Sequence, residues 1–335
     1  MSFTRHFKAG CDVTFDILNH TTMKKHLFIT GLCLQTLIIP GFGQGCSDAG
    51  FCTIGALKDN GAASEQTYNA SLAIGVGLGM GLEATSSITS YLEYNHAITS
   101  KWNLGAKITG GIYDGDLGSN AGPGDFFLSG SYTPKSTGNH KFSFLASLKA
   151  PLSTSDAKNN GDIPLPMEYQ SSLGTFDFIG GISYLYKNKW EISTGFQLPF
   201  SGANENEFLR FPSDSIEGDF NSTQEFERAG DVLLRAGYQF RFQENKLLVK
   251  PNLLAIYHLA EDSYSDAFNQ RRKIENSDGL TLNAGIMLTR IFKNNHQLEV
   301  IAAAPLVVRE ERPDGLTRSF VFNIQYQIPL FKSKK

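Results

Sequence analysis

The chain has 335 residues, enough for one large domain or two ordinary ones. Lys and Arg (30) nearly balance Asp and Glu (33), so the basic excess of a nucleic-acid-binding protein is missing. Gly (33) and Phe (25) are abundant, which favours strands and turns over long helices. The mean hydropathy of -0.20 excludes several membrane-spanning helices but not a barrel, in which only alternate residues face lipid.

The first element in chain order is an apolar run over residues 27–42, preceded by Met23-Lys24-Lys25. A basic start, a short apolar core and small residues at Gly41 and Gly43 are typical of a secretory signal peptide. A membrane anchor is the alternative, but the run is shorter than the ~20 apolar residues that a spanning helix needs. We therefore expect translation to start at Met23 and cleavage to follow Gly43.

Of the four cysteines, the exported chain would keep Cys46 and Cys52. An even pair in an exported protein suggests a disulfide. The alternative is a lipoprotein, in which Cys46 is lipidated and Cys52 is free. A metal site is not expected, because the segment has too few ligands and no nearby His.

From about residue 70 onward, apolar residues alternate with polar residues or glycine, which is the period of a β-strand. In the segment 70–82, aliphatic side chains share one face and the glycines from Gly75 to Gly81 share the other. A strand that crosses a membrane needs about 9–11 residues that are apolar on one face only. Because the glycine face is bare, we expect something to pack closely against it: the barrel wall, residues 44–68 or a ligand.

The alternation recurs along the rest of the chain. The expected strands are 69–82, 86–98, 102–113, 125–134, 140–151, 171–186, 189–199, 226–242, 246–259, 278–292, 296–306 and 317–331. Short connections are expected at 99–101, 135–139, 187–188, 243–245 and 293–295, and long ones at 114–124, 152–170, 201–225, 260–277 and 307–316. The first connection, near 83–85, is brief.

Short periplasmic turns that alternate with long external loops are typical of transmembrane barrels. The sequence thus predicts an all-β fold, a closed antiparallel transmembrane β-barrel of about 12 strands with both ends of the barrel chain on the periplasmic side. A soluble β-sandwich or lipocalin-like barrel is the alternative. Aromatic residues near the strand ends and a polar opposite face argue against it. The expected organisation is 1–22 non-native upstream sequence, 23–43 signal peptide, 44–68 periplasmic segment, 69–331 barrel and 332–335 basic tail.

The barrel pattern over 69–331, the exported start Gln44 to Cys52 and the last strand, Phe320 to Phe331, resemble outer-membrane barrel proteins of the Bacteroidetes. Within that class, the chain distantly resembles the fatty-acid transport type. The resemblance implies a place in the outer membrane of a Gram-negative cell, contact with outer-membrane lipid and insertion by the barrel-assembly machinery. In the family an aromatic residue usually comes last, whereas here a basic tail follows Phe331.

Ionisable residues gather on the faces that are predicted to point inward. A water-filled path between charged walls screens solutes, so we expect an outer-membrane channel or transporter that passively passes or binds an unidentified small solute. The alternative is a plugged barrel with a structural or surface-interaction role, acting through loops 201–225 and 260–277. The residues expected to line the lumen are Glu93, Lys107, Lys149, Asp177, Glu191, Asp231, Arg235, Arg241, Lys250 and Glu299.

An outer-membrane lipid hydrolase is the third hypothesis. It would need a base within hydrogen-bond reach of a nucleophile. His96 is predicted to face lipid, but Ser90 lies about six residues away on the same strand, at ~3.4 Å per residue. His258 is predicted to face inward near an external rim. We therefore expect no enzyme activity and no cofactor, and no nucleic-acid partner.

Overall fold

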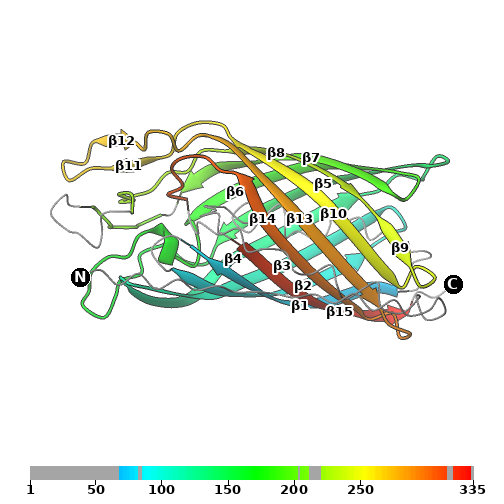
Figure 1. The fold of residues 1–335 in the computed structure, drawn as a ribbon. Helices are drawn as coiled ribbons and strands as arrows, with labels where there is room; N and C mark the ends of the chain where they lie inside the picture. The colour runs from blue at the N-terminus through cyan, green and yellow to red at the C-terminus, as the bar shows by residue number, and fades with distance from the viewer. Residues whose placement is uncertain (1–67, 82–84, 203, 211–219, 315–319, 333–335) are drawn as a thin grey trace, which may run out of the picture. The chain divides into compact units, whose positions relative to one another are not determined.

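The computed structural model describes residues 68–81, 85–202, 204–210, 220–314 and 320–332. The predictions for the first 67 residues, including those for Cys46 and Cys52, lie outside these ranges. Most of the described chain forms long antiparallel strands (Figure 1). The strands are β1 (Tyr68–Met80), β2 (Ser86–Ala97), β3 (Trp102–Gly115), β4 (Gly118–Tyr132), β5 (His140–Pro151), β6 (Thr175–Tyr186), β7 (Trp190–Gly202), β8 (Asp231–Tyr238), β9 (Phe240–Phe242), β10 (Leu247–His258), β11 (Ser263–Ser265), β12 (Arg271–Lys273), β13 (Gly279–Ile291), β14 (Gln297–Val307) and β15 (Phe320–Lys332).

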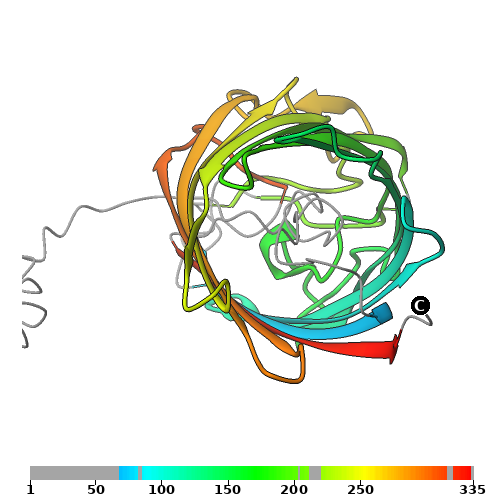
Figure 2. The ribbon, with the colours of Figure 1, turned by 90° about the vertical axis from the view of Figure 1, so that its right-hand side faces the viewer.

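The main sheet closes on itself. Neighbouring strands pair in chain order, β1 pairs with β15, and β10 pairs with β13. The sheet counts 13 strands because β8 and β9 are two parts of one strand, interrupted at Gln239 and both paired with β10. The result is the predicted closed barrel of twelve strands, whose ring is seen end-on in Figure 2. The hairpin of β11 and β12 forms a separate two-stranded sheet.

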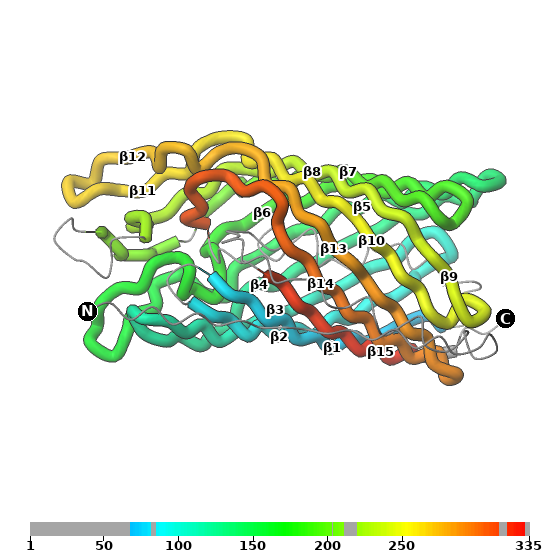
Figure 3. The backbone as a smooth tube through the Cα atoms, in the orientation of Figure 1, coloured from blue at the N-terminus to red at the C-terminus, as the bar shows by residue number. Residues whose placement is uncertain are grey.

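The connections define two ends of the barrel. The end that holds the turns β2–β3, β4–β5, β6–β7, β9–β10 and β13–β14 is called here the short-turn end, and the other is the long-loop end. The tube in Figure 3 shows this division. The longest loops, 152–174, 203–230 and 259–278, lie at the long-loop end, and the first of them contains the 3-10 helix η3 (Met167–Tyr169). Helices suited in length and apolarity to crossing a membrane are absent from the described ranges.

Several predicted boundaries are wrong. The expected long connection at 114–124 does not exist, because β3 and β4 keep pairing until Gly115 faces Gly118. Its glycine and asparagine content is typical of a loop, but the antiparallel ladder continues through a register shift near Gly110. The strands predicted at 171–186 and 226–242 begin later, at Thr175 and Asp231, because the residues before them belong to packed loops.

The outer surface of the barrel is apolar. Side chains such as Ile74, Leu104 and Leu234 alternate with buried neighbours and are 53%, 44% and 52% exposed. In water this surface would be a very large apolar patch, whereas hydrocarbon solvates it. Aromatic pairs such as Trp102 with Tyr132 and Trp190 with Tyr238 lie near the short-turn end. They match the predicted aromatic girdle at a membrane interface.

On the bare glycine face of β1, Tyr91 of β2 covers Gly75. A Cβ added to Gly75 would lie 2.1 Å from Cζ of the Tyr91 ring, so the ring lies directly over the glycine. The Tyr91 hydroxyl crosses β1 and donates to Gln325 of β15 at 2.8 Å. At Gly75, the group that packs against the glycine face is thus a side chain of the barrel wall itself. Tyr91 thereby fastens the seam between the first and last strands.

We expect Gly75→Ala to destabilise the barrel by about 1–3 kcal/mol, because the displaced Tyr91 ring loses its bond to Gln325. Urea unfolding in detergent, followed by tryptophan fluorescence, measures this change. The matched control is Gly202→Ala, where an added Cβ has nothing within 4 Å. In a Tyr91→Ser background, Gly75→Ala should lower the free energy of unfolding by much less than it does in the wild type. If the free-energy changes of the two substitutions simply add, Tyr91 does not contact Gly75 at the seam.

Candidate functional site

The residues predicted to line the lumen all lie on the inner face of the barrel, as the alternation of buried and exposed residues along each strand shows. Most are buried, among them Asp177 at 0% and Lys149 at 3% exposure. An isolated buried charge is very costly, so such residues need partners. The contacts described below show which partners they have.

Two groups of predicted residues form ion pairs on the wall. Glu191 of β7 contacts Lys250 of β10 at 2.8 Å and Arg235 of β8 at 3.2 Å. One carboxylate thus bridges two cations from two neighbouring strands. Lys149 of β5 contacts Asp177 of β6 at 2.9 Å, and it also donates to Thr175 at 3.0 Å.

Other predicted residues have mixed partners. Lys107 lies over the Tyr91 ring, 4.0 Å from its centroid, which is a cation–π contact. Glu93 accepts a hydrogen bond from Asn95 at 2.8 Å. Arg241 donates to Gln239 at 3.1 Å. Glu299 is paired in the sheet with Thr289 and Gln325.

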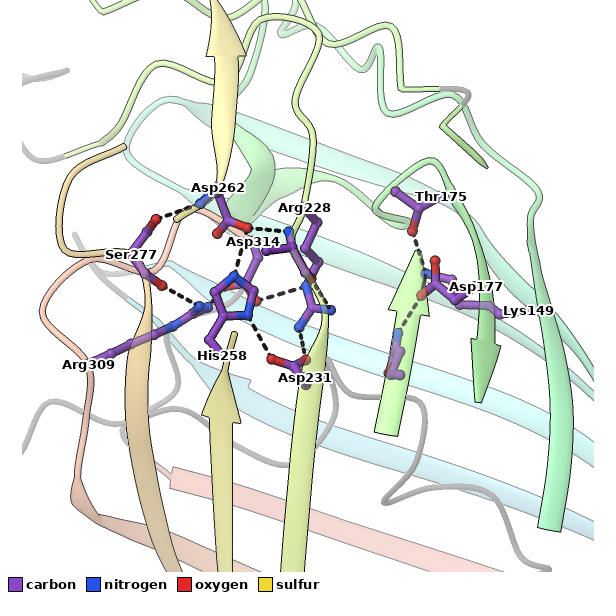
Figure 4. A network of polar contacts seen from close by, with 12 residues as sticks. Lys149, Thr175, Asp177, Arg228, Asp231, His258, Asp262, Ser277, Arg309 and Asp314 are labelled. Carbon is purple, nitrogen blue, oxygen red and sulfur yellow. Dashed lines mark hydrogen bonds and ion pairs between the residues drawn. The ribbon is translucent and has the colours of Figure 1, made fainter. Parts of the chain in front are cut away.

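A larger polar network lies at the long-loop end (Figure 4), and Asp231 is its only member that the sequence prediction named among the lumen-lining residues. Arg228 bonds to Asp231 and, at 3.1 Å, to Asp314. Arg309 also bonds to Asp314, and it donates to the Ser277 carbonyl at 2.6 Å. We call the set of Arg228, Asp231, His258, Asp262, Ser277, Arg309 and Asp314 the mouth network.

His258 lies between two carboxylates in this network. Its Nδ1 is 2.7 Å from Asp231 and its Nε2 is 2.8 Å from Asp262. A neutral imidazole has one N–H, so both contacts are hydrogen bonds to carboxylates only when the ring carries both protons. Asp262 also accepts from the Ala229 amide at 2.8 Å. The network therefore joins the ends of β8 and β10 to residues 228–230, 259–278 and 308–314 of the neighbouring loops.

The charges in the network stabilise one another. Burial alone would lower the pKa of Arg228, but Asp231, Asp314 and Asp262 raise it well above its ordinary value. Burial would likewise raise the pKa of Asp314, but Arg309 and Arg228 lower it well below its ordinary value. A carboxyl whose folded pKa is lowered stabilises the fold above its unfolded pKa of about 3.9, and this contribution is lost as the pH falls further.

The long loops pack on one another through apolar side chains. One cluster contains Leu165, Tyr169, Phe208 and Phe220, with Leu117 beside it. The second contains Met167, Leu173, Phe226 and Ile274, with Tyr264 beside it. We call these two clusters the loop cap. In the end-on view of Figure 2, the green segment that carries η3 lies within the ring of strands. The cap therefore occupies part of the long-loop mouth.

The structure pairs His96 with Tyr94, whose hydroxyl lies 3.1 Å from His96 Nδ1, and shows no contact between His96 and Ser90. In the described part of the chain, there is also no group of three or more His, Cys, Asp or Glu residues that could hold a metal ion. Among the described residues, His96 and Ser90 therefore do not form the hydrogen-bonded pair that the hydrolase hypothesis needs.

The barrel closure, the apolar outer surface and the charged interior together define the class of an outer-membrane β-barrel. The chain matches no protein-family model and no curated protein. Its fold is similar to a solved structure described as the COG4313 outer membrane channel from Pseudomonas putida F1, at TM-score 0.58 and 14% identity over 80% of this chain and 97% of that chain. This likeness supports the barrel fold.

More distant similar structures include a NanC porin, at TM-score 0.46 and 6% identity over 77% of this chain and 100% of that chain. Another is the translocator domain of the autotransporter NalP from Neisseria meningitidis, at TM-score 0.44 and 10% identity over 84% of this chain and 94% of that chain. These three structures are described as a channel, a porin and a translocator domain. The Bacteroidetes origin and the kinship to fatty-acid transporters stay predictions.

We expect Glu191→Gln to destabilise the barrel by about 3–5 kcal/mol, because it leaves Lys250 and Arg235 as buried charges without an ionised partner. Urea unfolding in detergent again measures the change. The matched control is Glu244→Gln, which breaks an exposed contact with Lys246 at 3.7 Å and should cost less than about 1 kcal/mol. Equal effects of the two substitutions would contradict the wall ion pairs.

Proposed function

We propose that the protein is an outer-membrane channel that passively passes or binds small polar solutes. The observation that carries this proposal is the division between the two faces of the closed sheet. The outer face carries apolar side chains, and the inner face carries ion pairs and hydrogen-bonded polar groups that span neighbouring strands. Paired charges on an inner wall attract polar solutes without holding them tightly, which conduction requires.

The loop cap sets the access to this path. Its side chains are almost fully buried, with Tyr169 at 0% and Phe220 at 1% exposure. Asn206 fastens the loops together, because its amide donates to the carbonyls of Ser155 and Leu165 at 2.9 Å each. A cap built in this way narrows the mouth from which solutes enter, and transport through it is selective and slow.

The same cap favours the second candidate function, a barrel with a blocked lumen that acts through its outer surface. The hairpin of β11 and β12 carries Phe268, which is 82% exposed. Flanking cations such as Arg272 are paired with nearby carboxylates such as Asp266. Planar bilayer recordings separate the two candidates. Steady single-channel steps support a channel, and silence over many insertions supports a blocked barrel.

In the same recordings, we expect Tyr169→Ala to raise the mean conductance or the open fraction severalfold. The substitution removes a buried side chain from the cap, which costs about 3–5 kcal/mol of packing. The matched control is Phe268→Ala, which removes an exposed aromatic ring from the same end of the barrel and should leave the conductance unchanged. If the two variants conduct alike, the cap does not control access.

A further inference from the structure

Arg312 lies in the segment that follows β14 at the long-loop end. In Figure 2 the orange-red continuation of β14 turns inward within the ring of strands. The segment is held there by neighbouring loops: the Glu311 amide donates to the Asn276 carbonyl at 3.1 Å, and Asn221 donates to the Glu311 carboxylate at 2.7 Å. Arg312 is therefore held in the mouth of the barrel, next to the mouth network.

Two nitrogens of the Arg312 guanidinium are buried without a hydrogen-bond partner among the described residues. Arg312 is 5% exposed, and its Nε and Nη1 atoms contact no hydrogen-bond acceptor among the described residues. Lys107 lies over the Tyr91 ring, and five other cations of the described interior contact carboxylates: Lys149, Arg228, Arg235, Lys250 and Arg309. A buried guanidinium with no counter-ion is costly, so its donors are suited to an anion supplied from outside the chain.

The nearest carboxylates do not fill this role. Asp314 already bonds to Arg228 and Arg309. Glu168 of η3 is 2% exposed, and its Oε2 atom has no hydrogen-bond partner among the described residues. Burial raises the pKa of Glu168 to about 8, with Asp314 adding to the rise and Arg312 opposing it. At neutral pH Glu168 is mostly protonated, and the Nε and Nη1 donors of Arg312 stay without a hydrogen-bond acceptor among the described residues.

We propose that Arg312 and Glu168 form a binding site for the carboxylate group of a small anionic solute at the long-loop mouth. Arg312 supplies the charge and the paired N–H donors that match a carboxylate. The protonated carboxyl of Glu168 donates a further hydrogen bond to the same group. The inference deepens the proposed function, on which it rests, by naming the chemical class of the solute.

The charge around the site favours a monoanion. The charged groups near enough to affect the pKa of Arg312 are Asp314, Arg309, Glu311 and Glu168, and Asp314 and Glu311 each have contacts of their own. One guanidinium and one neutral acid balance a single negative charge, whereas a phosphate dianion would face the Asp314 and Glu311 carboxylates. When Glu168 ionises above about pH 8, its charge repels the bound carboxylate and the affinity falls.

Isothermal titration calorimetry of the purified full chain in detergent tests the site, with D-glucuronate as the anionic probe and D-glucose as the neutral one. We expect glucuronate to bind at least about tenfold more tightly than glucose, and Arg312→Gln to remove this preference. The matched control is Arg272→Gln, which removes an exposed arginine from the hairpin of β11 and β12 and should leave binding within about twofold of wild type.

A second arm uses pH and does not need the Arg312 variant to fold. Glucuronate binding to the wild type should weaken as the pH is raised through about 8, and Glu168→Gln should bind equally on both sides of this value. Equal binding by wild type and a folded Arg312→Gln variant would overturn the proposal, and so would a wild type that shows no pH dependence. Phosphate that binds more tightly than glucuronate would overturn the assignment to carboxylates.

The calorimetry and the single-channel recordings test the carboxylate site and the channel separately. Calorimetric binding in a protein that gives no single-channel steps would reject the channel and keep the carboxylate site. Steady channels with no preference for glucuronate over glucose would keep the channel and reject the site.

Discussion

In hydrocarbon, a backbone N–H or C=O group has no water to bond, so every such group in a membrane-spanning segment needs a partner within the protein. A sheet meets this demand only when its first and last strands pair. Here β1 and β15 pair along their whole length, from Tyr68 with Lys332 to Met80 with Phe320. Closure in turn divides the side chains between lipid and the interior, and it brings the charges of neighbouring strands within contact distance of one another.

The interior charges serve the two parts of the molecule differently. At the wall, residues such as Lys149 and Asp177 connect strands that the backbone already pairs, so they mainly compensate one another's burial. At the long-loop end, Arg228, Asp262 and Asp314 connect loops that lie outside the barrel ladder and that share isolated backbone contacts, such as the bridge between Glu227 and Ser263. There the ion pairs and the apolar clusters around Tyr169 add to sparse backbone pairing, as in the core of a small soluble domain.

The alternation of residues predicted the strands of the closed barrel well, because side-chain direction along a strand depends only on the period of two. It failed at 114–124, where glycine and asparagine are compatible with both a loop and a continuing hairpin. The mouth network was not predictable in the same way. Arg228 and Asp314 are 86 positions apart, and nothing local in either segment indicates that the loops bring them together. His258 was placed inward, but its partner Asp262 lies beyond the end of its strand.

The ring of Tyr91 over Gly75 has a consequence for how the barrel is completed. Gly75 faces Tyr91 on one side and Gln325 on the other, so the three residues form one row across three strands. When the last strand arrives, a slip of one residue would bring Ile324 or Tyr326 beside the waiting hydroxyl and turn the lipid-facing set inward. The Tyr91 hydroxyl of β2 thus helps to set the register between β1 and β15, although β2 is not one of these two closing strands.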